Sequence, residues 1–496
     1  MKKLISTLKH QYWLVFLLIF GVAFARCVMT LDPDFGWRLR SGWHFRENGI
    51  TMTEPFTYTA SDFPWVNHAA VSDVILSFVY DFGDGLGLNG FVLVAILYAG
   101  IYTLAFFIIW RAALVKNPKI SPWLLLCGAV AMLPFIRVGA ITFSVLLLAA
   151  LIWLLAKPLN QPSWRRILIP LLFMTWGNLH GSFMVGLGYF GYKIFYEALF
   201  SDGVVFVKGR VLSITRRLVE MRWIIGLLVL SALATLVNFY GYHVYREILM
   251  TLGDSSLSGT IAEWQPGMPT TMVPIMILFI LGYGLLAQQD APGGKWQWVK
   301  RIMSVENIFF LAAVSSVRHW PLFILVAFGP MTDRLDLGLA PYRKQLKNNQ
   351  KLRRFMNGVW IGIATLTVGL GIINTAPQSA RFSARPSEIV AYIRNVPCEG
   401  NIFNTYNIGG YLIWQLPEYP IYIDGRMPSW VHNGRNYMAD YLRVYKDREF
   451  RRGEFERHNI RCAILNEDDK IVRELESEGW QMVMRDDGFV LLRAPR

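Results

Sequence analysis

Two carboxylates stand at the end of the first hydrophobic segment. Asp32 and Asp34, separated by Pro33, directly follow an apolar run over residues 12–30. Charged groups are costly inside hydrocarbon and tolerated just outside it, so this pair would meet the polar end of a membrane-dissolved molecule. A carboxylate there can take a proton from an attacking hydroxyl, and two can hold a divalent cation beside a phosphate. The alternative is a solvated loop in which Pro33 ends a helix.

Polar side chains that could bind a substrate recur at the ends of later apolar segments. Arg137 and Arg318 carry the planar guanidinium that binds phosphate through two hydrogen bonds, although interfacial snorkelling explains them equally well. Asn178 and His180 lie at a glycine-flanked helix break, where they either hydrogen-bond a sugar or pack a kink. Tyr240 could stack on a sugar face, or it belongs to an interfacial aromatic belt. The predicted substrate-binding set is Asn67, His68, Arg137, Asn178, His180, Tyr240, Glu263, Arg318 and His319.

The histidines do not predict a metal site. His68, His180, His243 and His319 show no zinc-type spacing such as His-Glu-x-x-His. The metal candidates are therefore Asp32 and Asp34, with Mg²⁺ or Mn²⁺ as the ion, and the sequence leaves the cofactor open.

Long apolar segments dominate the composition. The chain of 496 residues is 54% hydrophobic and only 17% charged, whereas soluble domains are about 25% charged. We therefore predict an α-helical polytopic membrane protein. Residues 376–496 differ, because they contain 17 basic and 17 acidic residues, so the net charge of +14 lies entirely in the preceding part. That excess reflects membrane topology and not a nucleic-acid partner.

Basic clusters set the predicted orientation, because Lys and Arg concentrate in cytoplasmic loops. Six basic clusters precede residue 355, and we place all of them in the cytoplasm. The N-terminus is then cytoplasmic, and the acid pair and the C-terminal domain lie outside the cytoplasmic membrane. Lys2-Lys3 and Ala23-Phe24-Ala25 resemble a signal peptide, but apolar residues continue beyond that site, so we expect an uncleaved span. About 11 crossings result, at residues 12–30, 91–110, 120–136, 138–156, 167–179, 182–198, 223–238, 271–287, 303–317, 320–333 and 356–374.

Two extracytoplasmic parts are expected. The first outer loop, residues 31–90, should contain an amphipathic helix over 34–48 at the membrane surface and an interfacial helix over 68–80, followed by a loop at 83–85. It belongs to a transmembrane domain of residues 1–374. We predict that residues 375–496 form a small α/β domain with a largely parallel sheet. Its strands are expected at 401–403, 421–423, 462–465, 481–484 and 489–492, and its helices at 387–394, 409–415, 437–445 and 468–478.

Several side chains of this α/β domain could bind substrate or serve its structure. Five polar residues follow predicted strands: Asn404, Tyr406, Asn407, Asp424 and Arg426. They either contact substrate or have structural roles, as loop caps and as an Asp–Arg ion pair. Cys398 and Cys462 lie beside predicted strands, in a compartment where disulfides persist. Because the strand order is unknown, a bridge and two buried free cysteines both stay open.

Several runs together resemble a group of uncharacterised bacterial multispan proteins. These runs are Asp-Pro-Asp-Phe-Gly-Trp-Arg-Leu-Arg-Ser-Gly at 32–42, Thr-Glu-Pro-Phe-Thr-Tyr-Thr at 53–59, Pro-Trp-Val-Asn-His at 64–68, Trp-Gly-Asn-Leu-His-Gly at 176–181, Asn-Phe-Tyr-Gly at 238–241, Glu-Trp at 263–264, Asn-Ile-Gly-Gly-Tyr at 407–411 and Ile-Asp-Gly-Arg at 423–426. The layout is similar to that of the GT-C glycosyltransferases, with an acidic motif after the first span, a helical outer loop, many spans and an outer C-terminal domain.

The resemblance implies a function. GT-C enzymes use lipid-phosphate-linked sugars, so Asp34, or else Asp32, would be the acidic residue at the reaction centre. The expected activity moves a sugar from a polyprenyl-phosphate donor to a glycan, lipid or protein acceptor at the outer face of the bacterial cytoplasmic membrane. A lipid-linked sugar flippase or transporter and a non-catalytic envelope assembly protein are the alternatives. The sugar, the acceptor, the lipid length and the metal dependence stay open.

Overall fold

The computed structural model divides the chain into two compact units, each described separately below. Unit 1 comprises residues 1–28, 95–241 and 258–377, and unit 2 comprises residues 29–94, 242–257 and 378–496. The structure describes residues 2–30, 32–114, 122–159, 163–200, 216–254, 257–287, 294–342 and 385–495, with the further positions 348–351, 354, 358, 362 and 369.

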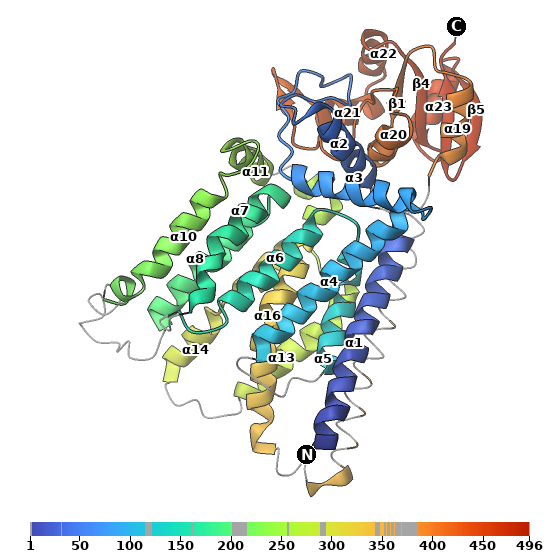
Figure 1. Ribbon diagram of the computed structural model, residues 1–496. Helices are drawn as coiled ribbons and strands as arrows, with labels where there is room; N and C mark the ends of the chain where they lie inside the picture. Colours follow the sequence, from blue (N-terminus) through green and yellow to red (C-terminus); the bar gives the residue numbers. More distant parts are fainter. Residues whose placement is uncertain are drawn as a thin grey trace. The chain divides into compact units, whose positions relative to one another are not determined.

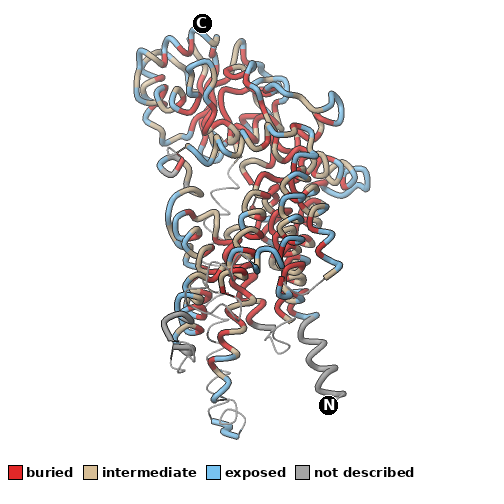
Figure 2. Tube along the Cα trace, turned by 90° about the vertical axis from the view of Figure 1, so that its left-hand side faces the viewer, coloured by how far each residue is buried: buried red, intermediate tan, exposed pale blue. Residues whose placement is uncertain are grey.

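Unit 1 is built of helices (Figure 1), most of which are apolar. Their sequences are hydrophobic around most of the circumference, as in helices that face lipid or each other rather than water. Buried and exposed stretches alternate along them (Figure 2). The main helices are α1 (Lys2–Met29), α4 (Gly90–Leu114), α5 (Pro122–Ala131), α6 (Ile141–Leu154), α7 (Ile169–Leu179), α8 (Phe183–Phe200), α10 (Arg222–Ala234), α13 (Val273–Ala287), α14 (Gly294–Ile302), α15 (Val305–Ser315) and α16 (Trp320–Leu339). Helices α1 and α4 begin or end in unit 2.

Most of the predicted spans coincide with these helices. Among the described residues, α4 alone is both long and apolar enough to cross a membrane by itself, and several shorter apolar helices accompany it. The count of about 11 crossings therefore stays a prediction. The expected span at 356–374 lies almost wholly outside the described residues, as does most of the basic cluster before it.

Unit 2 joins the first outer loop to the C-terminal domain. The loop forms α2 (Phe35–Asn48) and α3 (Ala70–Gly85), so the turn expected at 83–85 is helical instead. Glycines allow α2 to approach its neighbours, since a methyl group at Gly42 would collide with the backbone of Asp73 and one at Gly36 with that of Gly410. Helix α2 thus packs between α3 and α20 (Gly409–Gln415) and does not present one apolar face to a membrane. The sequence interpretation assigned this loop to the transmembrane domain, whereas the contacts group it with residues 378–496.

The C-terminal domain contains a four-stranded sheet. Its strands are β1 (Asn401–Asn404), β4 (Ile460–Asn466), β5 (Gln481–Asp486) and β6 (Phe489–Arg493), in the order β1-β4-β6-β5. Only β1 and β4 are parallel, so the prediction of a largely parallel sheet is wrong. The cause is a tight hairpin at Asp487-Gly488, where both residues have positive φ, as this kind of turn requires. The Asp-Gly pair is visible in the sequence.

Helices and short strands complete the domain. Helices α19 (Ser387–Asn395), α20, α21 (Tyr437–Lys446) and α23 (Lys470–Ser477) fall where the sequence predicts them, whereas α22 (Arg448–Arg457) was missed. The expected strand at 421–423 is reduced to isolated bridges, in which Ile421 pairs with Thr57 and with Ile402. A separate two-stranded ribbon is formed by β2 (Val431–His432) and β3 (Arg435–Asn436).

A disulfide joins Cys398 to Cys462, with Cα atoms 6.2 Å apart. It ties the segment before β1 to β4 and closes 64 residues of chain, which contain α20, α21 and α22. Of the two outcomes that the sequence left open, the structure thus has the bridge.

We expect the Cys398→Ser/Cys462→Ser variant to lose about 2–5 kcal/mol of domain stability, because the unfolded chain regains the entropy of an open loop. Proteolysis of the native protein with increasing protease measures this loss. The Cys27→Ser variant is the control, because Cys27 is not bridged. Peptide mapping of the unreduced protein that finds two freely alkylated thiols would contradict the bridge itself.

Candidate functional site

The acid pair forms the N-terminal turn of α2 in unit 2. Asp32 Oδ1 accepts the backbone N–H of Asp34 at 2.9 Å, which fixes the short Asp-Pro-Asp turn. Asp34 occupies the N-cap position of α2, and its Oδ1 accepts the indole N–H of Trp37 at 2.9 Å. Asp32 is 5% exposed, whereas Asp34 is partly exposed. Asp34 is therefore the more accessible carboxylate, and Asp32 holds its backbone.

The C-terminal domain contacts Asp34 directly. Gly425 lies against the Asp34 carboxylate so closely that a methyl group at this glycine would collide with Oδ1. The two flanking residues, Asp424 and Arg426, belong to a buried ion cluster. The position of the carboxylate thus depends on the loop between β1 and β4 as well as on α2.

Arg426 joins the first outer loop to the C-terminal domain. Its guanidinium donates to Glu54 at 2.6 and 2.9 Å and to Asp424 at 2.8 and 2.5 Å. The Arg426 side chain is only 3% exposed, and both carboxylates are fully buried. Although burial alone lowers the pKa of Arg426, the two carboxylates raise it above its usual value, so the residue stays charged. Four aromatic rings surround the guanidinium at 5.0–5.6 Å, those of Trp37, Phe56, Trp65 and Trp430.

A second buried network supports α2 from the other side. Arg38 donates to Asp73 Oδ1 at 3.1 Å, and Asn67 donates to Asp73 Oδ2 at 2.8 Å. Burial raises the pKa of Asp73 to about 6, although Arg38 and Asn67 both oppose that shift. The charge of Arg38 also acts on Asp34 and Asp32. The predicted site residue Asn67 therefore positions α2 and α3, with its side chain 4% exposed as part of this network.

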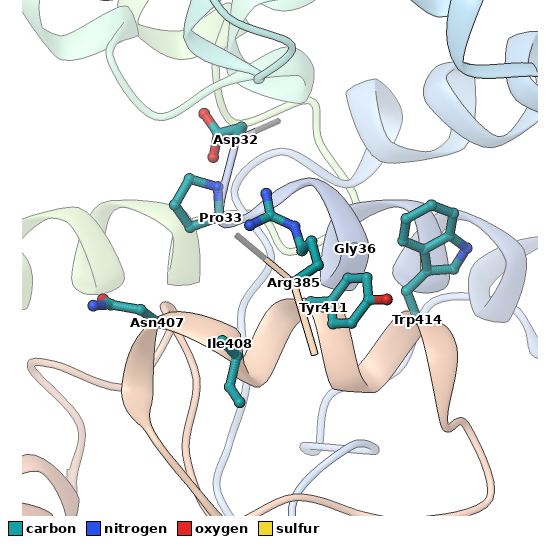
Figure 3. A pocket seen from close by; sticks show the side chains of 8 residues that line it. All are labelled: Asp32, Pro33, Gly36, Arg385, Asn407, Ile408, Tyr411 and Trp414. Carbon is teal, nitrogen blue, oxygen red and sulfur yellow. The ribbon is translucent and has the colours of Figure 1, made fainter. Parts of the chain in front are cut away.

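A small pocket opens beside the acid pair within unit 2. Asp32, Pro33 and Gly36 line it from the first outer loop, and Arg385, Asn407, Ile408, Tyr411 and Trp414 line it from the C-terminal domain. Figure 3 shows the Arg385 side chain extending toward the Asp32–Pro33 segment. Burial lowers the pKa of Arg385, although Tyr411, Asp487 and Asp32 raise it. The pocket combines a carboxylate with guanidinium, amide and phenol groups, but its volume of about 10 Å³ has room for little more than one water molecule.

A second group of predicted residues gathers in unit 1. Arg137 pairs with Glu263 at 2.5 Å, and this arginine lowers the pKa of Glu263, whose side chain is about half exposed. The guanidinium of Arg318 lies over the ring of Trp264 at 4.1 Å from its centroid. The backbone of Val317 donates to Gln265, which joins the two short segments. The structure thus brings together Arg137, Glu263 and Arg318 within unit 1, and their role in binding substrate stays a prediction.

The remaining predicted residues have contacts that serve packing. His180 Nδ1 lies 3.0 Å from Ser144 Oγ and 2.8 Å from Ser182 Oγ, in a buried network at the ends of α6 and α7. Asn178 donates to the carbonyls of Met174 and Val237 at 2.9 and 2.7 Å. Tyr240 is 4% exposed. His319 Nδ1 lies 3.0 Å from the carbonyl of Ala312, and His68 is half-buried. Their roles in binding substrate stay predictions.

Metal binding rests on the acid pair. Within the described ranges, no group of three or more His, Cys, Asp or Glu side chains could enclose an ion. Asp32 and Asp34 each use one carboxylate oxygen inside the turn. Binding of Mg²⁺ or Mn²⁺ by Asp32 and Asp34, with further ligands from substrate phosphate and water, stays a prediction.

Three contributors to this site were not predicted from the sequence. In the sequence, Glu54 and Arg38 stand out only as parts of longer motifs. Arg385 stands in a polar segment without periodicity. The signal that could have identified Glu54 is its position as the one charged residue of 48–61, a long loop segment rich in aromatic residues and threonine, since a carboxylate that becomes buried needs a cation.

Comparison with known proteins identifies the fold. No protein-family model and no curated protein matches the chain. ArnT from Cupriavidus metallidurans in the apo state is similar over 99% of this chain and 100% of that chain, with 13% identity and a TM-score of 0.57. The archaeal oligosaccharyltransferase AglB from Archaeoglobus fulgidus, in complex with an inhibitory peptide and a dolichol-phosphate, is similar over 92% of this chain and 69% of that chain, with 13% identity and a TM-score of 0.54. At these identities the likeness shows the fold: the chain has the fold of these two proteins, in agreement with the GT-C layout predicted from the sequence.

Proposed function

We propose that this protein, with its GT-C fold, is a membrane glycosyltransferase that moves a sugar from a polyprenyl-phosphate-linked donor to an acceptor at the outer face of the cytoplasmic membrane. The observation that carries the proposal is the Asp32-Pro33-Asp34 turn, where a partly exposed carboxylate is oriented by Trp37. The similarity to the dolichol-phosphate-bound oligosaccharyltransferase supports a lipid-linked donor.

Asp34 is the proposed general base. The acceptor hydroxyl attacks the anomeric carbon of the sugar and loses its proton to the Asp34 carboxylate, while the bond from that carbon to the phosphate oxygen breaks. The electron pair of the broken bond leaves with the lipid phosphate. Because a phosphate is already a stable anion, this leaving group needs no strong general acid. Asp32 acts as a positioning residue through its hydrogen bond to the backbone of Asp34.

Arg318 and Arg137 are the proposed phosphate-binding residues. A guanidinium matches a phosphate through paired hydrogen bonds. Glu263 already neutralises much of the Arg137 charge, whereas Arg318 is held over the face of Trp264. This difference favours Arg318 as the principal phosphate ligand.

The outer-face location is supported by two independent features. Lys and Arg concentrate in the loops assigned to the cytoplasm. The C-terminal domain carries a disulfide, and disulfides persist in oxidising compartments outside the cytoplasm.

We expect reporter fusions or cysteine labelling at Ser61 and Asp469 to report both positions outside the cytoplasm, because the charge pattern puts both there. A label at Lys300, in a basic cluster assigned to the cytoplasm, serves as the internal reference. A cytoplasmic signal at Ser61 or Asp469 would contradict the proposed orientation.

The activity itself is tested with purified protein in lipid vesicles. Candidate polyprenyl-phosphate sugars are offered with envelope glycans or lipids as acceptors, with and without a chelator of divalent cations. Release of polyprenyl phosphate together with a labelled acceptor supports transfer. Movement of the intact donor across the bilayer without release of polyprenyl phosphate would instead identify a flippase.

A further inference from the structure

A basic pocket lies in unit 1, between the end of α6 and the beginning of α7. Its cavity of about 190 Å³ is lined by Trp153, Leu154, Ala156, Lys157, Ser163, Trp164 and Arg165. The cavity is well above the ~10–15 Å³ that one water needs, so it admits a group of several heavy atoms. Helices α6 and α7 pack side by side, which places the two walls next to each other (Figure 1).

The walls of this pocket are fixed by a buried arginine. The Arg166 side chain donates to the carbonyls of Lys157, Pro158 and Leu159 at 2.7, 2.8 and 3.0 Å. These bonds join the turn after α6 to the short helix Trp164–Leu168 before α7. Arg166 itself is fully buried, so its neighbour Arg165 faces the other way.

The pocket presents positive charge beside indole rings. The Arg165 guanidinium lies 4.8 Å from the ring centroid of Trp153 and 6.0 Å from that of Trp164. Lys157 adds a second cation, and no carboxylate is among the described lining residues. The nearby Glu197 is already paired, since it accepts the Leu159 N–H at 2.6 Å and forms an ion pair with Lys193. The side chains of Lys157 and Arg165, together with the Ser163 hydroxyl, can bind a phosphate group.

The surface next to the pocket is apolar. Trp164 is 72% exposed and Ile167 71% exposed, and the neighbouring Leu168 and Leu171 are also exposed. Exposed indole and aliphatic side chains beside Lys and Arg are typical of the zone where a membrane protein meets lipid headgroups. A free phosphate in water would gain nothing from this apolar flank, whereas the acyl chains of a lipid would cover it.

We propose that this pocket binds the phosphate headgroup of an anionic phospholipid of the bilayer, with Lys157 and Arg165 as phosphate ligands and Trp164 and Ile167 against the acyl chains. The inference does not depend on the transferase activity. The site involves none of the residues assigned to the acid pair or to donor binding.

The test measures bound lipid by native mass spectrometry of the full-length protein after exchange into defined mixtures of phosphatidylglycerol and phosphatidylcholine. We expect the wild type to retain phosphatidylglycerol in preference to phosphatidylcholine. The Lys157→Gln/Arg165→Gln variant should bind phosphatidylglycerol about 30-fold more weakly, since each cation at a lipid surface contributes about fivefold. The Arg443→Gln/Arg452→Gln variant removes two exposed cations of the C-terminal domain and should behave as the wild type.

Two outcomes would overturn the assignment. One is equal retention of phosphatidylglycerol by the wild type and the Lys157→Gln/Arg165→Gln variant. The other is displacement of the lipid by millimolar inorganic phosphate, which would identify a site for a soluble phosphate instead. A Trp164→Ala/Ile167→Ala variant provides a second measurement, since loss of acyl contacts should weaken lipid binding without changing the response to inorganic phosphate.

Discussion

The Asp34→Asn variant should lose transfer activity by about 10²–10⁴-fold, because an amide cannot accept the proton of the attacking hydroxyl. The fold should persist, since an asparagine oxygen still accepts from Trp37 and the Asp34 side chain makes no capping hydrogen bond that could be lost. Release of polyprenyl phosphate under single-turnover conditions measures the chemical step. The temperature of unfolding in detergent checks that the variant is folded.

Two further variants give this experiment its controls. Asp32→Asn should reduce transfer less than Asp34→Asn does, because Asp32 orients the Asp34 backbone and an asparagine oxygen can still accept that N–H. Asp62→Asn removes an exposed carboxylate of the same loop and should leave transfer unchanged. Near-normal turnover in Asp34→Asn would exclude Asp34 as the base, and a larger loss in Asp32→Asn would transfer that role to Asp32.

The Arg426→Gln variant should lose about 3–5 kcal/mol of stability, because Glu54 and Asp424 then remain buried without their cation. The loss should be concentrated in unit 2, since the pair joins the first outer loop to the C-terminal domain. Limited proteolysis that monitors cleavage within residues 49–68 measures it. Transfer should fall as well, because Gly425 next to Arg426 contacts the Asp34 carboxylate.

Glu54→Gln leaves Arg426 with Asp424 as a partner, so its effect should be smaller than that of Arg426→Gln. Arg443→Gln removes an exposed arginine of the same domain, whose partner Asp447 lies at the surface, and should not change proteolysis. Equal protease resistance in Arg426→Gln and the wild type would show that the buried ion cluster does not hold the loop.

Local sequence patterns predicted the helices and strands well, but they did not predict which of these elements pack against each other. The amphipathic run at 34–48 and the alternation of strands and helices after residue 386 gave nearly correct bounds, because both signals depend on residues close in sequence. The sheet was predicted to be largely parallel because alternating strands and helices are typical of parallel sheets. The Asp487-Gly488 pair forms a tight turn, which reverses the chain after β5 and makes β5 and β6 antiparallel.

The sequence predicted those site residues that are marked by a local pattern, but not the residues that hold them in place. The position of Asp32 and Asp34 at the end of an apolar run is a local feature, and so is the occurrence of arginines at other helix ends. The partners of Arg426 and Arg38 are distant in sequence, and their burial is invisible in a hydropathy pattern. Arg38, for example, is paired with Asp73 and only 8% exposed, although it lies away from the apolar face of the expected helix.

The pairing of the first outer loop with the C-terminal domain also sets an order of events during synthesis. The Thr59 hydroxyl donates to the carbonyl of Tyr422, a residue 363 positions later in the chain. At about 5–20 residues per second, the ribosome needs roughly 20–70 s to make that partner. During this interval the loop has left the ribosome with Phe56, Trp65 and Glu54 lacking their final neighbours. Completion of unit 2 is therefore a late step, and a chain released before residue 426 leaves a loop that a quality-control protease can cut.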